Sequence, residues 1–170
     1  MSDTMNNRHS YGRALGWGYE GKSVEDLLEY CCSEDATVVV DVRLNAISRK
    51  KGFSKTALRS ALENASISYF HLRQLGNPKD NRKGFWSPGT VAAVNAHRRF
   101  TEEILTSQAA QEQLELAEDL LIYHNVVFIC FEHEQCTCHR ELVIQEIEKR
   151  IRQNKGEGVS RNSLVVALAG

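Results

Sequence analysis

The sequence predicts an α/β fold, a three-layer sandwich with a mostly parallel central sheet of about five strands. Its length of 170 residues suits one domain with its own core. Short β-branched runs alternate along the chain with segments of helical periodicity, which implies parallel strands joined by right-handed crossovers. We therefore expect one domain over residues 1–170, in which the polar residues 1–12 are flexible.

The first elements are a short strand, a helix and a buried strand. We expect the first strand over residues 13–17. Ser23 stands three residues before Asp26, a spacing typical of a capping box, so a helix should run from there to about residue 33. Residues 37–42 are apolar and β-branched without clean alternation, as in a strand covered on both faces. This strand should form the centre of the sheet.

The middle of the chain continues the alternation and then becomes polar. Ser54 can cap a helix that runs to about residue 64, with Leu58 and Leu62 spaced for burial. Residues 67–72 have the composition of another strand. The polar connection over residues 73–89 is long, and loops of this length usually carry function or move.

The C-terminal half has the same character, with amphipathic helices around a second strongly apolar strand. We expect helices over 90–106 and 109–123, a strand over 126–131, a helix from about Cys138 to Gly156, and a last strand over 164–168.

Charge is strongly divided along the chain, although the net charge is only −1. Residues 42–99 hold twelve basic and two acidic residues, a net charge of +10, which leaves −11 for the remainder. If folding gathers the basic side chains on one face, that face attracts polyanions. The alternative is a set of solvated surface charges without a ligand.

Composition and missing motifs exclude several classes of protein. No apolar run approaches the roughly 18 residues of a membrane span. No secretory signal is readable and the five cysteines form no disulfide framework, so we expect a cytoplasmic protein with reduced thiols. The sequence has no Walker A loop, dinucleotide fingerprint or nucleophile elbow, which argues against P-loop nucleotide hydrolysis, a dinucleotide site and an α/β-hydrolase.

Ligands of parallel α/β sheets bind beyond the carboxyl ends of the strands, and four polar segments should meet there. They are residues 18–23, 41–53, 71–89 and 132–140. Asp41 and Arg43 end a buried strand and point the same way, so Asp41 can orient a catalytic group while Arg43 holds an anion. The alternative for this pair is a structural salt bridge.

The segment after the second buried strand carries reactive residue types. Cys138 precedes His139 and Arg140 near an expected helix N-terminus, a setting that lowers a thiol pKa or binds an anion. His133 and Cys136 add two more zinc-ligand types, but so short a span cannot readily wrap a tetrahedron by itself. We assign no metal site, and the sequence does not indicate a cofactor.

Aromatic residues accompany the basic ones. Phe85 and Trp86 lie in the long polar connection, where they can stack on bases while the basic side chains neutralise phosphates. This composition favours a nucleic acid or a nucleotide as the polyanion.

Several motifs together resemble the domain-of-unknown-function family 488. They are Gly18-Tyr19-Glu20-Gly21-Lys22-Ser23, Asp41-Val42-Arg43, Ser48-Arg49, Gly52-Phe53-Ser54-Lys55, Tyr69-Phe70-His71-Leu72, Leu75-Gly76-Asn77-Pro78, Cys130-Phe131-Glu132 and Cys138-His139-Arg140. The resemblance implies one α/β domain with a shared polar site. It implies no particular reaction.

The leading hypothesis is a protein that binds phosphate-containing polyanions, nucleic acid or nucleotide, at the carboxyl edge of the sheet and processes them. The alternatives are a non-catalytic binding module for a nucleic acid or metabolite, and a cysteine-dependent enzyme that acts on a small anion. The candidate catalytic residues are Asp41, Glu132, Cys138 and His139, and the candidate binding residues are Tyr19, Arg43, Ser48, Arg49, Lys51, His71 and Arg140.

Overall fold

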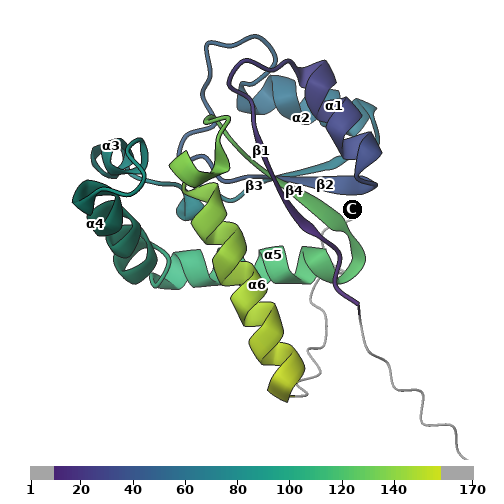
Figure 1. Cartoon of the computed structure of the whole chain (residues 1–170). Coiled ribbons are helices and arrows are strands. Elements are labelled where there is room, and N and C mark those ends of the chain that lie inside the picture. Colours follow the sequence, from purple (N-terminus) through teal and green to yellow (C-terminus); the bar gives the residue numbers. More distant parts are fainter. Residues whose placement is uncertain (1–9, 158–170) are drawn as a thin grey trace, which may run out of the picture.

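A computed structural model of the chain describes residues 10–157 and contains a four-stranded parallel sheet (Figure 1). The strand order is β1-β4-β2-β3, so the strand latest in sequence lies between the first two. The strands are β1 (Ala14–Gly18), β2 (Ala36–Asp41), β3 (Ser68–His71) and β4 (Asn125–Cys130).

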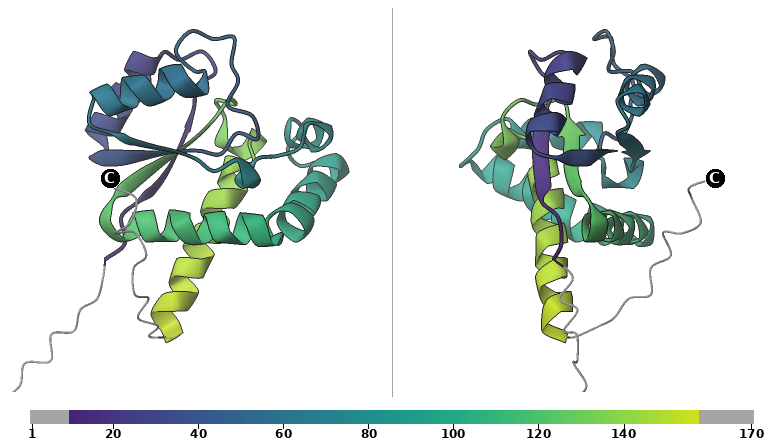
Figure 2. Two further views of the ribbon diagram at one scale, coloured as in Figure 1. Left: turned by 180° about the vertical axis from the view of Figure 1, so that it is seen from behind. Right: turned by 90° about the vertical axis from the view of Figure 1, so that its right-hand side faces the viewer.

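Helices connect the strands and cover both faces of the sheet, which makes three layers (Figure 2). On one face lie α1 and α2, and on the other lie α5 and α6, with α3 and α4 beside them. The helices are α1 (Val24–Ser33), α2 (Lys55–Asn64), α3 (Arg82–Phe85), α4 (Val91–Arg99), α5 (Gln108–Tyr123) and α6 (Arg140–Glu157).

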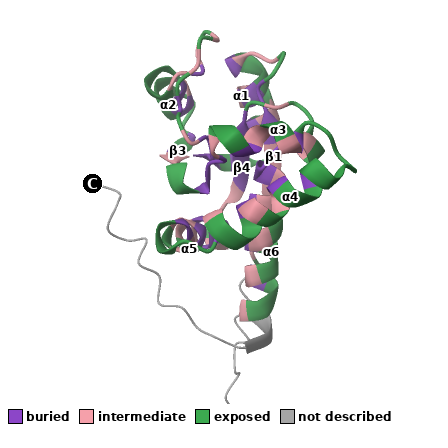
Figure 3. Ribbon diagram, turned by 90° about the vertical axis from the view of Figure 1, so that its left-hand side faces the viewer, coloured by how far each residue is buried: buried purple, intermediate pink, exposed green. Residues whose placement is uncertain are grey.

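Each face of the sheet has its own apolar core, because successive residues of a strand point to opposite sides. Val39 and Val127 face Leu27 and Leu58 of α1 and α2. Val38, Val40 and Phe128 face the other layer, where the core continues into α5 and α6. Figure 3 shows buried residues concentrated between the layers, with exposed residues on the outer helix surfaces.

The predicted α/β class, the parallel sheet and the flanking helices are confirmed, but the described residues contain four strands rather than five. The strand expected over 164–168 lies outside the described residues, as do the first nine residues of the segment expected to be flexible. Ser23 and Asp26 form the predicted capping box of α1, with bonds of 3.1 and 2.6 Å.

Most predicted boundaries agree with the structure to within one residue, but three parts of the chain differ more. The helix expected over 90–106 is α4 followed by a π-helical turn, Phe100–Ile104. The long polar connection holds two 3₁₀ turns and the short helix α3. Helix α6 begins at Arg140, so Cys138 lies in extended backbone two residues before it rather than in its first turn.

No helix among residues 10–157 has the length and apolar character of a membrane span.

Candidate functional site

A cavity of about 240 Å³ lies at the carboxyl ends of β1, β2 and β4. The residue that follows β1 (Tyr19), the last residue of β4 (Cys130) and the loop after β2 all line it. The lining residues are Tyr19, Arg43, Leu44, Asn45, Ile47, Asn77, Arg82, Phe85, Trp86, Cys130, Phe131, Glu132, Thr137 and His139. All four segments predicted to meet at this edge contribute to the cavity or flank it.

Asp41 forms a buried brace beneath the cavity. Its side chain is fully buried, and its Oδ2 accepts from Arg43 Nη2 at 2.5 Å and from the Tyr69 hydroxyl at 2.6 Å. Burial and the neighbouring carboxylate raise the pKa of Tyr69, so the phenol remains a donor. Arg43 and Tyr69 therefore hold Asp41 in an internal network. This agrees with the alternative prediction for Asp41 and Arg43, a structural salt bridge.

Arg43 lines the cavity, but its guanidinium is hydrogen-bonded within the same internal network. Its Nη1 donates to the Tyr19 hydroxyl at 3.1 Å and to the Phe53 carbonyl at 2.8 Å. Burial lowers the pKa of Arg43, but the hydrogen bonds and charge of Asp41 raise it well above its ordinary value. The guanidinium stays charged, with its charge largely balanced inside the protein.

Arg82 is the cavity-lining arginine that forms no ion pair with a carboxylate among residues 10–157. Its Nε donates to the Asn77 carbonyl at 3.1 Å, which holds the half-buried side chain against the wall. Three large apolar side chains that line the same cavity are exposed to solvent: Ile47 (84%), Trp86 (55%) and Phe131 (45%). The lining of the cavity therefore combines a cation with apolar and aromatic surface.

Two thiols, an imidazole and a carboxylate meet at the end of β4. The Sγ atoms of Cys130 and Cys138 each lie 3.9 Å from Nδ1 of His139, and Oε2 of Glu132 lies 3.4 Å from Sγ of Cys130. On the other side of the ring, Nε2 of His139 donates to the Val42 carbonyl at 2.9 Å. Because a carbonyl only accepts, the proton of the neutral ring is on Nε2 and Nδ1 has its lone pair free.

Burial controls the chemistry of these groups. Burial raises the pKa of the Cys138 thiol well above its ordinary value, and the Cys130 thiol raises it further. Burial also raises the pKa of Glu132, but hydrogen bonds from its own backbone amide and from both thiols bring it below the ordinary value. For His139 burial lowers the pKa, and Cys138, Val42 and Glu132 together outweigh that effect. Because its pKa is raised, the Cys138 side chain is a protonated thiol at neutral pH.

The other predicted binding residues divide into internal and exposed groups. Arg140 is buried and donates to the carbonyls of Glu132 and His133 at 2.5 and 2.9 Å, while Nε2 of His71 donates to the Arg43 carbonyl at 2.8 Å. Ser48, Arg49 and Lys51 belong to the loop after β2, outside the cavity lining, and the two basic side chains are exposed.

The structure identifies residues that sequence reasoning passed over. Arg82 was one of the twelve basic residues, and only the fold distinguishes it from the others. Cys130 was read as part of a strand, yet the fold places its thiol beside Cys138 and His139, whereas Cys136 is exposed. Phe85 is wrong as a stacking candidate, because it is 2% exposed and packs against Phe100 and His97.

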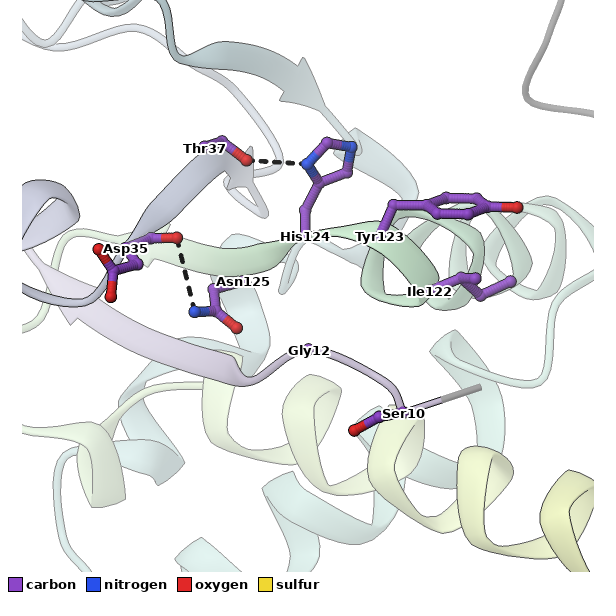
Figure 4. A pocket seen from close by; sticks show the side chains of 8 residues that line it. All are labelled: Ser10, Gly12, Asp35, Thr37, Ile122, Tyr123, His124 and Asn125. Atoms are coloured by element: carbon purple, nitrogen blue, oxygen red, sulfur yellow. Dashed lines mark hydrogen bonds between the residues drawn. The ribbon is translucent and has the colours of Figure 1, made fainter. Parts of the chain in front are cut away.

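A second cavity, of about 270 Å³, lies at the opposite end of the sheet (Figure 4). It is lined by the residues around the start of β4, where the Thr37 hydroxyl and Nδ1 of His124 lie 2.8 Å apart. No Lys or Arg lines it, and the exposed Asp35 gives it an acidic group. Its chemistry does not match a phosphate ligand.

The fold and the cavity define a doubly wound parallel α/β protein with a polar site at the carboxyl edge of its sheet. The family model described as the domain of unknown function DUF488 matches residues 23–147, and the chain belongs to this family. Comparison with curated proteins and with solved structures gave no match.

Proposed function

We propose that the protein binds a nucleotide unit, free or within a nucleic-acid chain, in the cavity at the carboxyl edge of the sheet. One observation carries the proposal: the lining of a single cavity combines Arg82 with the exposed aromatic residues Trp86 and Phe131. A nucleotide joins a flat base to an anionic phosphate. Aromatic side chains stack on the base, and arginine donates to phosphate oxygens.

The size of the cavity favours one nucleotide rather than a larger cofactor. Its volume of about 240 Å³ lies just below the range of about 300–1,000 Å³ that is usual for drug-sized ligands. A dinucleotide would extend beyond it. Ile47 and Trp86 line the cavity and are exposed to solvent, so the rest of a polynucleotide can continue from the cavity over the surface.

Basic side chains flank the cavity on two segments. The loop that brings Ile47 to the cavity also carries Arg49 and Lys51, both exposed. The segment that brings Arg82 carries Lys79 and Lys83, also exposed. Such surface charges add sequence-independent, salt-dependent affinity for a phosphate backbone. They favour a nucleic-acid strand over an isolated small anion.

The thiol-enzyme alternative receives less support. A nucleophilic cysteine needs a lowered pKa, and burial raises that of Cys138. The extended backbone at this residue also removes it from the helix N-terminus that would have stabilised a thiolate.

Tryptophan fluorescence tests the proposal, because Trp86 lines the cavity and the other tryptophan, Trp17, is buried elsewhere. A nucleoside monophosphate and a single-stranded oligonucleotide should both quench the emission of Trp86. Arg82→Gln should weaken both ligands about tenfold, the loss of one charged hydrogen bond. Trp86→Ala, followed by calorimetry, should weaken them about 5- to 100-fold through lost stacking.

Arg98→Gln is the matched control, since Arg98 belongs to the same basic segment but is exposed on α4 and does not line the cavity. It should leave the monophosphate affinity unchanged. The proposal fails if neither ligand binds at low salt, or if Arg98→Gln weakens the monophosphate as much as Arg82→Gln does.

A further inference from the structure

Three metal-ligating side chains converge where β4 ends. The Sγ atoms of Cys130 and Cys138 and the Nδ1 atom of His139 all lie within 4.8 Å of one another, and all three residues are buried. They come from two segments, the end of β4 and the residues just before α6, so the fold supplies the wrapping that residues 133–139 cannot supply alone.

The spacing approaches that of a tetrahedral zinc site. With Zn–S bonds of about 2.3 Å and Zn–N bonds of about 2.0 Å, tetrahedral geometry separates sulfur from nitrogen by about 3.5 Å. Each Sγ lies 3.9 Å from Nδ1 of His139. The two sulfurs lie within 4.8 Å of each other, against about 3.8 Å in a tetrahedral site, so an inward shift of the side chains brings all three donor atoms into bonding distance of one central ion.

His139 is already oriented as a metal ligand. Its Nε2 donates to the Val42 carbonyl at 2.9 Å, which fixes the ring and leaves the Nδ1 lone pair directed at the two thiols. Metal-bound histidines almost always make such a bond from the second ring nitrogen, because it selects the tautomer and strengthens the donor. The ring is only 6% exposed, so its orientation is fixed by the protein around it.

The fourth position needs a donor from outside this cluster of three, and Glu132 offers a carboxylate oxygen next to Cys130. Its Oε2 lies 3.4 Å from Sγ of Cys130. Arg140 donates to the Glu132 carbonyl at 2.5 Å, which anchors this segment and places a positive charge on it. Two thiolates and a carboxylate carry more negative charge than a divalent ion neutralises, and the Arg140 guanidinium offsets part of that excess.

We propose that Cys130, Cys138 and His139, with Glu132 in the fourth position, bind a zinc ion at the wall of the cavity. Two thiolates and an imidazole select Zn²⁺ over Mg²⁺ or Ca²⁺, which prefer oxygen donors. Each thiol releases its proton to solvent when its sulfur binds the metal. The ion enters from the cavity, which Cys130, Glu132 and His139 line.

Cobalt titration of the intact, unmodified chain is the first test, because it depends on no variant. After dialysis against a chelator, one equivalent of Co²⁺ should produce thiolate-to-cobalt charge-transfer absorption together with the intense visible bands of a tetrahedral ion. One equivalent of Zn²⁺ should abolish both. Absence of the charge-transfer band, or absorption that never saturates at a defined ratio, overturns the proposal.

Matched variants assign the ligands. Cys138→Ser should weaken Zn²⁺ by more than about 100-fold, beyond the usual effect of an outer-shell change. Cys136→Ser, two residues away and exposed, should leave affinity unchanged. Glu132→Gln should weaken Zn²⁺ by at least about tenfold, whereas Glu134→Gln, whose side chain is 72% exposed, should not. Equal losses in the Cys138 and Cys136 variants overturn the assignment.

Circular dichroism confirms that each variant folds, and a variant that does not fold is set aside in favour of the unmodified-chain titration. The zinc site does not depend on the nucleotide proposal. Metal binding is measured with the ion alone, and nucleotide binding is measured on chelator-treated protein, so either result can fail without the other.

Discussion

The Nε2 atom of His139 and the carbonyl oxygen of Val42 are 2.9 Å apart, although 97 residues separate them in the chain. This bond joins the residues just before α6 to the loop that leaves β2. The same loop carries Arg43, and the same turn carries Cys138. One hydrogen bond therefore ties the loop that carries Arg43 to the turn that carries Cys138.

The buried pair of Asp41 and Arg43 should dominate the stability of this edge of the sheet. Asp41→Asn removes the negative charge and leaves a buried guanidinium without its partner, which costs about 3–5 kcal/mol. Urea denaturation measures this loss in the free energy of unfolding. Asp80→Asn, which removes the exposed partner of Arg99, is the control and should change stability little.

The capping box of α1 should make stability depend on pH. Hydrogen bonds with the backbone amide and the hydroxyl of Ser23 lower the pKa of Asp26 below its unfolded value. Its stabilising contribution is therefore present above the unfolded pKa of about 3.9 and is lost as the pH falls through the folded pKa. Asp26→Asn should lower the Tm at neutral pH, and the difference from the natural chain should close in acid.

Glu25→Gln is the control for this prediction, because Glu25 shares the first turn of α1 but makes no capping bond. A difference in Tm between the Asp26 variant and the natural chain that persists undiminished in strong acid would contradict the assignment of the effect to ionised Asp26.

Thiol labelling should follow burial. Cys32 and Cys136 are exposed, whereas Cys31, Cys130 and Cys138 are buried, and burial raises the pKa of Cys31 to about 11. Iodoacetamide at neutral pH should therefore modify Cys32 and Cys136 first, and the other three only after unfolding. Peptide mass spectrometry gives the order. Selective early labelling of Cys138 would instead revive the thiol-enzyme alternative.

Two glycines of β1 should differ in their tolerance of a methyl group. A Cβ on Gly18 meets the backbone carbonyl of Glu132, while a Cβ on Gly16 meets the end of the Gln135 side chain. Backbone cannot move aside as a flexible side chain can, so Gly18→Ala should destabilise the fold and disturb the segment that carries Glu132. Gly16→Ala should do so much less.

Thermal unfolding measures the loss of stability in each glycine variant, and the cobalt titration measures the disturbance of the segment that carries Glu132. Equal losses of stability in the two glycine variants would show that the close approach of Gly18 to the backbone of Glu132 is not what excludes a side chain there.

The sequence predicted the fold well because its strongest signals are local. The apolar run before Asp41 and the run before Phe131 each specify a buried parallel strand, and the capping residues around Ser23 specify a helix start. The helix start near residue 138 was misplaced by two residues, because a 3₁₀ turn over Gln135–Thr137 precedes it.

The site was less predictable because it depends on which residues of distant segments meet. Sequence placed Asp41 and Arg43 at the correct edge, but it could not show that their charges satisfy each other. It located Cys138 and His139 but not their neighbour Cys130, since the register of β4 decides which side of the strand that thiol occupies. It could not separate Arg82 from eleven other basic residues in its segment.

Insertion of β4 between β1 and β2 has a consequence for biosynthesis. The first strand borders β4 and not β2, so its place at the edge of the sheet exists only after residues 125–130 have left the ribosome. Until then the nascent N-terminal segment has an unsatisfied edge and exposed apolar surface, conditions that invite aggregation. Chaperone dependence should therefore concentrate in the interval before that late strand emerges.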